Sequence, residues 1–385
     1  MDMSFPIIEK LSDVEPVIDA IPEIKLFQKD GYQVVNYVFQ KNDTFFNSCP
    51  YIRAMSRECR GLIFDSAGKL ISRRYHKFFN VGENKETQNL QVYHWPALDK
   101  LDGTMIGPFM IGQELIWGTK MGCTEISQYV NMFVNRNPLY DYFVRPLLLL
   151  GMTPIFEYVS KNNRIVLDYP QENMILTAIR NNRDGSYVPY ENMANHAENS
   201  GIPCVSMLGF AHELVDNIPH REDIEGVVLR HSSGVMVKMK TEWYVKRHRC
   251  LDSVDNEKSL LIFVLQDRLD DILPLLTPSR KLIVQKYAEH VLIHLTKYID
   301  KMIKDHIDIR SRMTRKEFAL FNYDLCNISK PMHFALWNHN TDKIDHEFVK
   351  KILLSLVMNN GLISGQRYDN LIPIWGSKTL RDFEV

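Results

Sequence analysis

One short segment of the chain carries residue types that could support covalent chemistry. Lys100 and Leu101 are followed by Asp102, Gly103 and Thr104. A lysine amine is nucleophilic only when it is neutral, so it needs a lowered pKa, which neighbouring cations, a metal ion or partial burial supply. Gly103 would let the backbone approach a ligand closely. The segment could therefore present Lys100 as a nucleophile, although taken alone it favours a surface lysine before a turn.

Other charged residues follow at positions from which strands could bring them toward this lysine. Lys120 ends an expected strand, and Glu157 lies in another, on the face opposite its two aromatic neighbours. Glu225 and Gly226 open a third strand. Together these residues could line one polar site around Lys100.

Lys238 and Lys240 are two apart in an expected strand with the sequence VKMK. Side chains two apart in a strand point to the same face, so both ammonium groups would be aimed together. A phosphate is a natural partner for such a pair. The polar outer face of a half-buried sheet is the simpler explanation of the pair taken alone.

The elements that must position these side chains are short strands, followed later by helices. Runs of β-branched and aromatic residues, interrupted by Gly, Asp and Ser, predict the strands. They are expected at 31–37, 61–65, 69–74, 105–111, 115–120, 154–159, 173–178, 226–230 and 235–240. A helical pattern over 125–150 is expected to break at Pro138 and at Pro146.

The pattern changes after about Leu251, where apolar residues recur at helical spacing. Thr277 before Pro278 predicts the start of a helix, and Thr314 with Glu317 predicts a capping box. We therefore expect an α+β domain over residues 1–250 and an all-α domain over residues 251–385.

The composition is that of an ordinary globular chain of two domains. Hydrophobic residues make up 45% and charged residues 24% of the 385 residues. The net charge of −1 means that binding to nucleic acid would need a local basic patch. The six cysteines form no C-x-x-C pair, and neither a signal peptide nor a membrane-spanning stretch is visible. We expect a cytoplasmic protein without a membrane partner.

Taken together and in order, the charged segments resemble the nucleotidyltransferase superfamily of ATP-dependent ligases and mRNA capping enzymes. The matching motifs are 100–104 (KLDGT), the region around Lys120, 156–159 (FEYV), 224–228 (IEGVV) and 237–240 (VKMK). Each motif is weak alone, whereas five in the same order with plausible gaps are a strong signal. The resemblance implies an ATP-grasp-like ligase domain with antiparallel sheets, followed here by the helical domain.

Two upstream segments narrow the resemblance to the phage-type RNA ligase 1 family, as found in T-even phages. They are 58–64 (ECRGLIF) and 76–80 (HKFFN). The segments 163–167 (NRIVL) and 240–245 (KTEWYV) are also similar to that family, so the resemblance covers roughly residues 30–250. It implies three transfers: Lys100 attacks the α-phosphate of ATP, AMP then moves to the 5′-phosphate of RNA, and a 3′-hydroxyl finally displaces AMP.

The resemblance also implies the phosphate-binding residues. Lys238 and Lys240 would act in catalysis by neutralising the α-phosphate and keeping Lys100 unprotonated. Arg60 and Lys77 would hold phosphates of ATP or RNA. The remaining residues of the implied nucleotide site are Lys120, Phe79, Asp102, Gly103, Glu157, Glu225 and Gly226.

These remaining residues have distinct implied roles. Phe79 would shape the nucleotide pocket, although an ordinary core aromatic explains it equally well. Glu157 would accept a hydrogen bond from a ribose hydroxyl. Glu225 would organise Mg²⁺, for which Mn²⁺ could substitute. Asp102 and Gly103 would shape the loop of the nucleophile.

The implied partners are single-stranded RNA or the ends of a nicked tRNA loop, with a polynucleotide kinase–phosphatase as companion enzyme. Residues 251–385 could act as an RNA-specificity module. Two alternatives remain: a capping-type guanylyltransferase that uses GTP, and a catalytically inactive RNA- or nucleotide-binding module. Capping enzymes usually carry a β-barrel after the last motif, so the helical pattern here argues against the first. Every expected Lys, Glu and Gly is present, which argues against the second.

Overall fold

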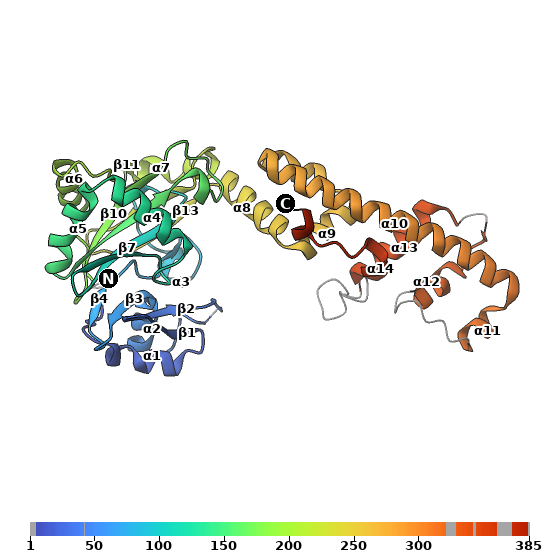
Figure 1. Ribbon diagram of the computed structural model, residues 1–385, viewed down its shortest axis with the longest axis horizontal. Coiled ribbons are helices and arrows are strands. Elements are labelled where there is room, and N and C mark those ends of the chain that lie inside the picture. Colours follow the sequence, from blue (N-terminus) through green and yellow to red (C-terminus); the bar gives the residue numbers. More distant parts are fainter. Residues whose placement is uncertain (1–4, 42, 321–328, 342–343, 360–371, 384–385) are drawn as a thin grey trace. The chain divides into compact units, whose positions relative to one another are not determined.

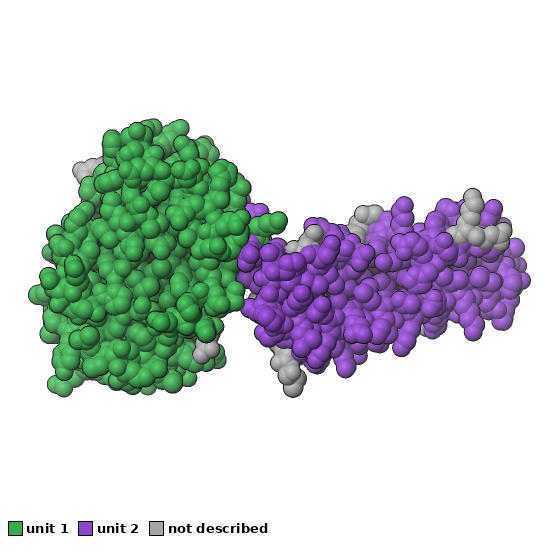
Figure 2. Space-filling model, turned by 90° about the horizontal axis from the view of Figure 1, so that it is seen from above, with its two compact units in different colours: residues 1–246 green, residues 247–385 purple. Residues whose placement is uncertain are grey.

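The computed structural model describes residues 5–41, 43–320, 329–341, 344–359 and 372–383 (Figure 1). The chain divides into two compact units, residues 1–246 and 247–385 (Figure 2). The first unit combines helices with three mainly antiparallel sheets. Every element in the described part of the second unit is helical. The predicted fold class, an α+β domain followed by a helical region, is confirmed.

The first sheet has the order β1-β2-β3-β4 and is antiparallel throughout. Its strands are β1 (Ile24–Lys29), β2 (Tyr32–Tyr37), β3 (Arg60–Asp65) and β4 (Leu70–Ser72). Two helices, α1 (Glu15–Ala20) and α2 (Pro50–Glu58), pack their apolar side chains against it. Neither β1 nor these helices is predicted from the sequence. The strand expected at 69–74 ends at Ser72, because Arg73 and Arg74 turn into the interior and are fully buried.

The second sheet has the order β10-β9-β7-β8. Its strands are β7 (Thr104–Ile111), β8 (Glu114–Gly118), β9 (Met152–Val159) and β10 (Asn173–Asn181). Three helices share its hydrophobic core: α4 (Glu125–Arg136), α5 (Leu139–Leu149) and α6 (Tyr190–Asn199). The break at Pro138 is confirmed, but the break expected at Pro146 is wrong, because α5 continues through this residue. Pro146 lies in the last turn of α5, so the one backbone hydrogen bond that its missing N–H costs does not stop the helix before Leu149.

The third sheet has the order β11-β6-β12-β13-β5 and carries the lysine segment. Its strands are β5 (Phe79–Asn80), β6 (Pro96–Asp99), β11 (Met207–Phe210), β12 (Gly226–Arg230) and β13 (Met236–Lys240). Only β5 runs parallel to its neighbour; the other pairs are antiparallel. The short helices α3 (Lys85–Gln88) and α7 (Ala211–Leu214) lie in the connections.

One buried arginine ties the first sheet to the second. The guanidinium of Arg74 donates to the carbonyl oxygens of Gly61 at 2.7 Å, Gly107 at 2.9 Å and Gly118 at 3.1 Å. These carbonyls belong to β3, β7 and β8. A Cβ atom at Gly107 would lie 2.9 Å from Arg74 Nε, so a glycine is needed for the arginine to fit.

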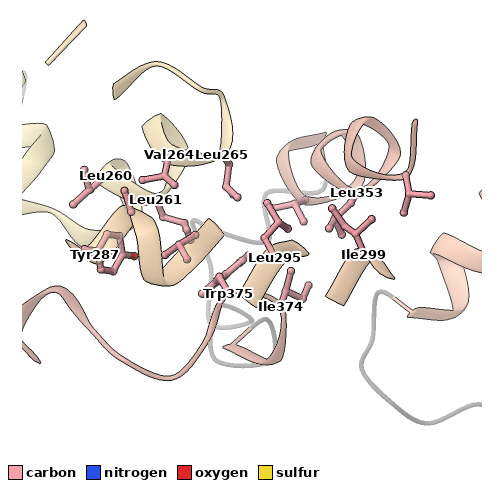
Figure 3. Packing of buried hydrophobic residues seen from close by; sticks show 14 of the residues in the cluster. Leu260, Leu261, Val264, Leu265, Tyr287, Leu295, Ile299, Leu353, Ile374 and Trp375 are labelled. Atoms are coloured by element: carbon pink, nitrogen blue, oxygen red, sulfur yellow. The ribbon is translucent and has the colours of Figure 1, made fainter. Parts of the chain in front are cut away.

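The second unit is built around one long helix, α10 (Pro278–Arg312). The other helices are α8 (Glu242–Asp255), α9 (Glu257–Leu265), α11 (Arg315–Leu320), α12 (Ser329–Leu336), α13 (His346–Asn359) and α14 (Ile372–Trp375). The division between the units falls within α8. Apolar side chains from α9, α10, α13 and α14 form the core (Figure 3). No helix in the described ranges is both long enough and apolar enough to cross a bilayer.

The predicted helix starts in this unit are confirmed. Thr277 accepts a hydrogen bond from the Arg280 amide at 3.3 Å, with Pro278 in the first helical position. The amide of Thr314 donates to the Glu317 carboxylate at 2.7 Å, and the Glu317 amide donates to the Thr314 hydroxyl at 3.3 Å. This reciprocal pair is the capping box expected from the sequence.

A buried pair of histidines should make this unit sensitive to acid. His306 of α10 and His333 of α12 are fully buried, with their Nδ1 atoms 3.1 Å apart. Burial lowers the pKa of both imidazoles to about 4, against an ordinary value of about 6.5. The unfolded chain therefore binds protons that the folded chain does not, and the free energy of unfolding should fall as the pH drops from about 6.5 to about 4.

Denaturant unfolding at a series of pH values, followed by hydrogen exchange in the peptides of α10 and α12, would measure this effect. A double variant with His306→Leu and His333→Leu should lose most of the pH dependence in those peptides. An unchanged dependence in the double variant would contradict the prediction.

Candidate active site

Lys100 lies at one end of the third sheet, directly after β6. Its amide donates to the carbonyl of Gly226 at 3.0 Å, which joins the lysine segment to the start of β12. The Lys100 ammonium is 2.7 Å from Glu225 Oε1, and the Lys240 ammonium is 2.8 Å from the same oxygen. Glu225 is buried, with 3% of its surface exposed. The structure therefore brings three predicted site residues, Lys100, Glu225 and Lys240, into direct contact.

Gly226 is needed for this end of the sheet to close. Its φ is +150°, and a Cβ atom would overlap with the carbonyl oxygen of Met239 on β13. A glycine accepts both the backbone angle and the close approach. Gly226 thus holds β12 against β13, so that Glu225 and Lys240 meet; its predicted contact with a cofactor stays a prediction.

Lys238 and Lys240 lie on the same face of the sheet, because side chains two residues apart in a strand point to the same side. It is paired in register with Val228, just as Lys240 is paired with Gly226. Burial lowers the pKa of the Lys238 amine to about 8, and the positive charge of Lys100 is the next cause. The two lysines of β13 therefore line the site together with Lys100.

Asp102 anchors the loop that follows the lysine. Its Oδ2 accepts hydrogen bonds from the amides of Val166 at 2.7 Å and Leu167 at 2.8 Å. Its Oδ1 accepts from the Tyr244 hydroxyl at 2.6 Å, and its own amide donates to the Tyr169 hydroxyl at 3.0 Å. With 2% of its surface exposed, Asp102 is a positioning residue for the loop.

Tyr244 and Tyr169 are residues of the site that the sequence reasoning missed. Tyr244 falls in the segment 240–245, which resembles the family, but its partner Asp102 is 142 positions away. Nothing in the residues around Tyr169 points to the lysine loop. Both contacts exist only because the fold brings distant segments together.

Glu157 lies in β9 and meets the same loop from the second sheet. Its Oε1 accepts a hydrogen bond from the Gly103 amide at 3.2 Å. Burial raises the pKa of this carboxyl to about 7, although the charge of Lys100 opposes the shift. A Cβ atom at Gly103 would overlap with the Tyr158 carbonyl oxygen, so glycine permits the loop to lie against β9. The expected opposite placement of Glu157 and its buried aromatic neighbours is confirmed.

A second group of cations gathers around the ring of Tyr37, at the end of β2. The ammonium of Lys120 is 5.1 Å and that of Lys77 is 6.0 Å from the centre of this ring. Burial alone would raise the pKa of the Tyr37 phenol, but Arg60, Lys120 and Lys77 together lower it. Arg60 and Lys77 also contribute to lowering the pKa of Lys238, so their positive charges act across the same site. Tyr37 is a further residue that the sequence reasoning missed.

Phe79 lies in the wall behind these cations. It is 4% exposed and packs against Phe46, with 5.1 Å between ring centres, and more distantly against Phe45. The Lys77 ammonium lies 5.3 Å from its ring centre. Because so little of the Phe79 ring is exposed, a nucleotide base would have little surface to stack on. Its burial is that of an ordinary core aromatic residue.

Glu225 is the residue that would hold a divalent metal ion. Its Oε1 receives both lysines, while its Oε2 has no hydrogen bond or ion pair with any described residue. Within the described ranges, no three His, Cys, Asp or Glu side chains cluster tightly enough to bind a metal. A single carboxylate fits Mg²⁺, which commonly takes one or two carboxylates together with substrate phosphates and water.

The antiparallel sheets, the lysine loop and the surrounding lysines and carboxylates are the features expected from the resemblance to nucleotidyltransferases of the ligase class. Residues 58–244 match the family model for RNA ligase. This matched region, just under half of the chain, is similar to RNA ligases, and together with the relatives below it supports an enzyme of the RNA ligase type. The resemblance drawn from the motifs is therefore confirmed.

Three curated relatives agree with the family. A putative RNA ligase from Thermovibrio ammonificans is 27% identical over 350 residues, 83% of this chain and 90% of that protein. A putative bifunctional polynucleotide kinase/RNA ligase from Autographa californica nuclear polyhedrosis virus is 24% identical, over 60% of this chain and 36% of that protein. RNA ligase 1 from bacteriophage TS2126 is 25% identical, over 63% of this chain and 62% of that protein.

Proposed function

We propose that this protein uses ATP to join a 5′-phosphate to a 3′-hydroxyl of single-stranded RNA, through an AMP bound covalently to Lys100 and then an RNA-adenylate. The observation that carries the proposal is the convergence of Lys100 and Lys240 on one buried oxygen of Glu225. This arrangement places a lysine amine, a second lysine and a carboxylate next to one another. The amine would attack the α-phosphate, the second lysine would neutralise negative charge, and the carboxylate would hold a metal ion.

In the first transfer, the amine of Lys100 attacks the α-phosphorus of ATP. A nitrogen–phosphorus bond forms, the bond to the pyrophosphate oxygen breaks, and the amine gives up its proton. Lys100 must leave its ion pair with Glu225 before it attacks, and Lys240 remains to neutralise that carboxylate. The Lys238 ammonium on the same face would stabilise the negative charge that develops on the α-phosphate.

The second and third transfers need positioning and charge neutralisation more than acid–base chemistry. Arg60, Lys77 and Lys120 supply three positive charges around Tyr37, where phosphates of ATP and then of RNA would bind. A guanidinium such as that of Arg60 can hold two phosphate oxygens at once. Glu157 would accept a hydrogen bond from a ribose hydroxyl.

Glu225 would hold Mg²⁺ or Mn²⁺, directly or through water. When bound, such an ion supplies positive charge that neutralises phosphate oxygens and orients them for in-line attack. Residues 1–250 would form the adenylyltransferase domain, and residues 251–385 would recognise the RNA. Single-stranded ends or the ends of a nicked tRNA loop are the proposed substrates, in a cytoplasmic repair reaction with a kinase–phosphatase as companion.

The test is a joining assay with the full chain, Mg²⁺ and a single-stranded RNA that carries a labelled 5′-phosphate and a 3′-hydroxyl. Circular or joined RNA is expected with ATP and not with GTP, and the same RNA with a 5′-hydroxyl should stay unjoined. Transfer of label from GTP to the protein, without joining, would favour the guanylyltransferase. A folded protein that binds RNA but joins nothing with either nucleotide would favour the inactive binding module.

A further inference from the structure

One cavity of the first unit shares no residue with the candidate active site. It has a volume of about 670 Å³, within the range of sites that hold small molecules. Several of its wall residues carry aromatic rings, and Glu191 and Arg230 contribute one charge of each sign. The residues that matter here are Tyr93, Trp95, Tyr187, Tyr190, Arg230 and His231.

Arg230, which lines the cavity, lies on the face of the third sheet that carries Lys238 and Lys240, at the opposite end of β12 from Gly226. Gly226, Val228 and Arg230 alternate along this strand, and residues two apart face the same side. Gly226 is paired in register with Lys240, and Val228 with Lys238. Arg230 is four steps along the strand from Gly226, which is about 13 Å at the usual rise of about 3.3 Å per residue. One strand of RNA could therefore reach both the nucleophile and the cavity.

Arg230 gives the cavity wall a cation with an unused donor. It is 6% exposed, and its Nη2 donates to the carbonyl of Val188 at 2.7 Å. Its Nη1 is buried and has no hydrogen-bond partner among the described residues, and Arg230 forms no ion pair with any of them. A buried charged donor left unpaired is costly. An acceptor atom of a ligand in the cavity, met by a small shift of the guanidinium, would remove that cost.

Exposed rings beside the cavity form a stacking surface. Tyr93 is 60% exposed, and its ring lies nearly parallel to that of His212, at 4.6 Å and 20°. His212 in turn is stacked with Phe210, at 6.2 Å and 24°. Inside the cavity, the ring of Trp95 lies 5.0 Å from that of His231. Aromatic faces of this kind hold unpaired bases of single-stranded nucleic acids without requiring a particular sequence.

We propose that this cavity binds an unpaired nucleotide of the RNA substrate, with its base against the aromatic walls and an acceptor atom bonded to Arg230. The proposal rests on the proposed RNA-joining function for the identity of the ligand. Arg230 is the only lysine or arginine among the described residues of the lining, which also contains the carboxylate of Glu191, so the cavity suits one nucleotide of a single strand, whereas the phosphates of ATP are better served by the lysines of the active site.

The test uses three variants of the full chain. Tyr93→Ala removes the exposed stacking ring, and Tyr93→Phe keeps it. Tyr142→Ala is the matched control, because Tyr142 on α5 is 74% exposed and does not line the cavity. Each protein is titrated against a fluorescein-labelled single-stranded oligouridylate without ATP, and its formation of lysyl-AMP from labelled ATP is measured separately.

Tyr93→Ala should weaken RNA binding by at least about fivefold, since stacking contributes about 1–3 kcal/mol per base. Tyr93→Phe and Tyr142→Ala should bind as the wild type does, and all three should form lysyl-AMP at the wild-type rate. Unchanged RNA affinity in Tyr93→Ala, or an equal loss in Tyr142→Ala, would overturn the proposal. So would a parallel loss of lysyl-AMP, which would assign the cavity to ATP.

A fourth variant, Arg230→Met, should also weaken RNA binding, and it breaks no ion pair that would be needed for folding. If it does not fold, the Tyr93 variants decide the question. Failure of the proposed joining function can be told apart from failure of the cavity proposal. If the wild-type protein joins no RNA but binds RNA in a way that depends on Tyr93, the cavity proposal stands and the ligase proposal is wrong.

Discussion

Replacing Lys100 by alanine is expected to abolish the covalent transfer of AMP from ATP to the protein, and with it the joining of RNA that starts from ATP. The amine is the only group of the proposed first transfer that forms a bond to phosphorus, so no neighbouring side chain can compensate for its loss. The measurement is incubation with α-labelled ATP and Mg²⁺, followed by denaturation and detection of label on the chain.

Two further variants separate the nucleophile from its charge. Lys100→Arg keeps a cation beside Glu225 but offers no nucleophilic amine, so it should be as inactive as Lys100→Ala. Lys29→Ala removes an exposed lysine of β1 and should label like the wild type. RNA that already carries a 5′-adenylate should still be joined by Lys100→Ala, because the third transfer does not use the amine. Label on Lys100→Ala would rule out Lys100 as the nucleophile.

Replacing Glu58 by alanine is expected to cause the largest loss of stability. Glu58 is 2% exposed and receives Arg73 Nε on one oxygen and Arg180 Nη2 on the other, each at 2.9 Å. Both arginines are fully buried. Although burial opposes ionisation, Arg180 and Arg73 lower the pKa of the Glu58 carboxyl to about 2. Removing this carboxylate leaves two buried cations uncompensated, which typically costs about 3–5 kcal/mol.

Denaturant unfolding, followed by hydrogen exchange in peptides of β3 and β10, measures this loss within the first unit. The control is Glu86→Ala, which breaks an ion pair of 2.9 Å with Arg57 at a carboxylate that is 40% exposed. Exposed pairs contribute less than about 1 kcal/mol. Equal losses in the two variants would show that the buried network contributes no more than a surface pair.

The Glu58 network also changes how the ECRG segment is understood. The resemblance marks the whole segment as a family motif, but its two charged residues differ in role. Glu58 ends α2 and points into the interior, where it pairs with the two arginines. Arg60 opens β3, and its charge acts on the nucleotide site through Tyr37 and Lys238. Burial, which the linear motif does not show, separates the structural charge of Glu58 from the proposed binding charge of Arg60.

Local patterns predicted the elements that carry their own signal. Alternation and β-branched residues identified β2, β3, β9, β10, β12 and β13, and the caps at Thr277 and Thr314 identified helix starts. The strand that delivers Lys100 was missed, because β6 begins at Pro96 and is only four residues long. Pro146 was given too much weight, because it lies in the last turn of α5, where one missing backbone hydrogen bond does not prevent the helix from reaching Leu149.

The sequence by itself indicated Lys100 as the candidate nucleophile, the order of the motifs, the resemblance to RNA ligases and the helical character of the second unit. These properties depend on residue identity and on short spacing, which can be read along the chain. Only the tertiary structure decided that Lys100 and Lys240 contact one oxygen of Glu225, that Tyr244 donates to Asp102, that three cations surround Tyr37, and that the buried Arg230 forms no ion pair with a described residue. Ion pairs and desolvation depend on distance in space and on exclusion of water, and both arise only when segments far apart in the chain are packed together.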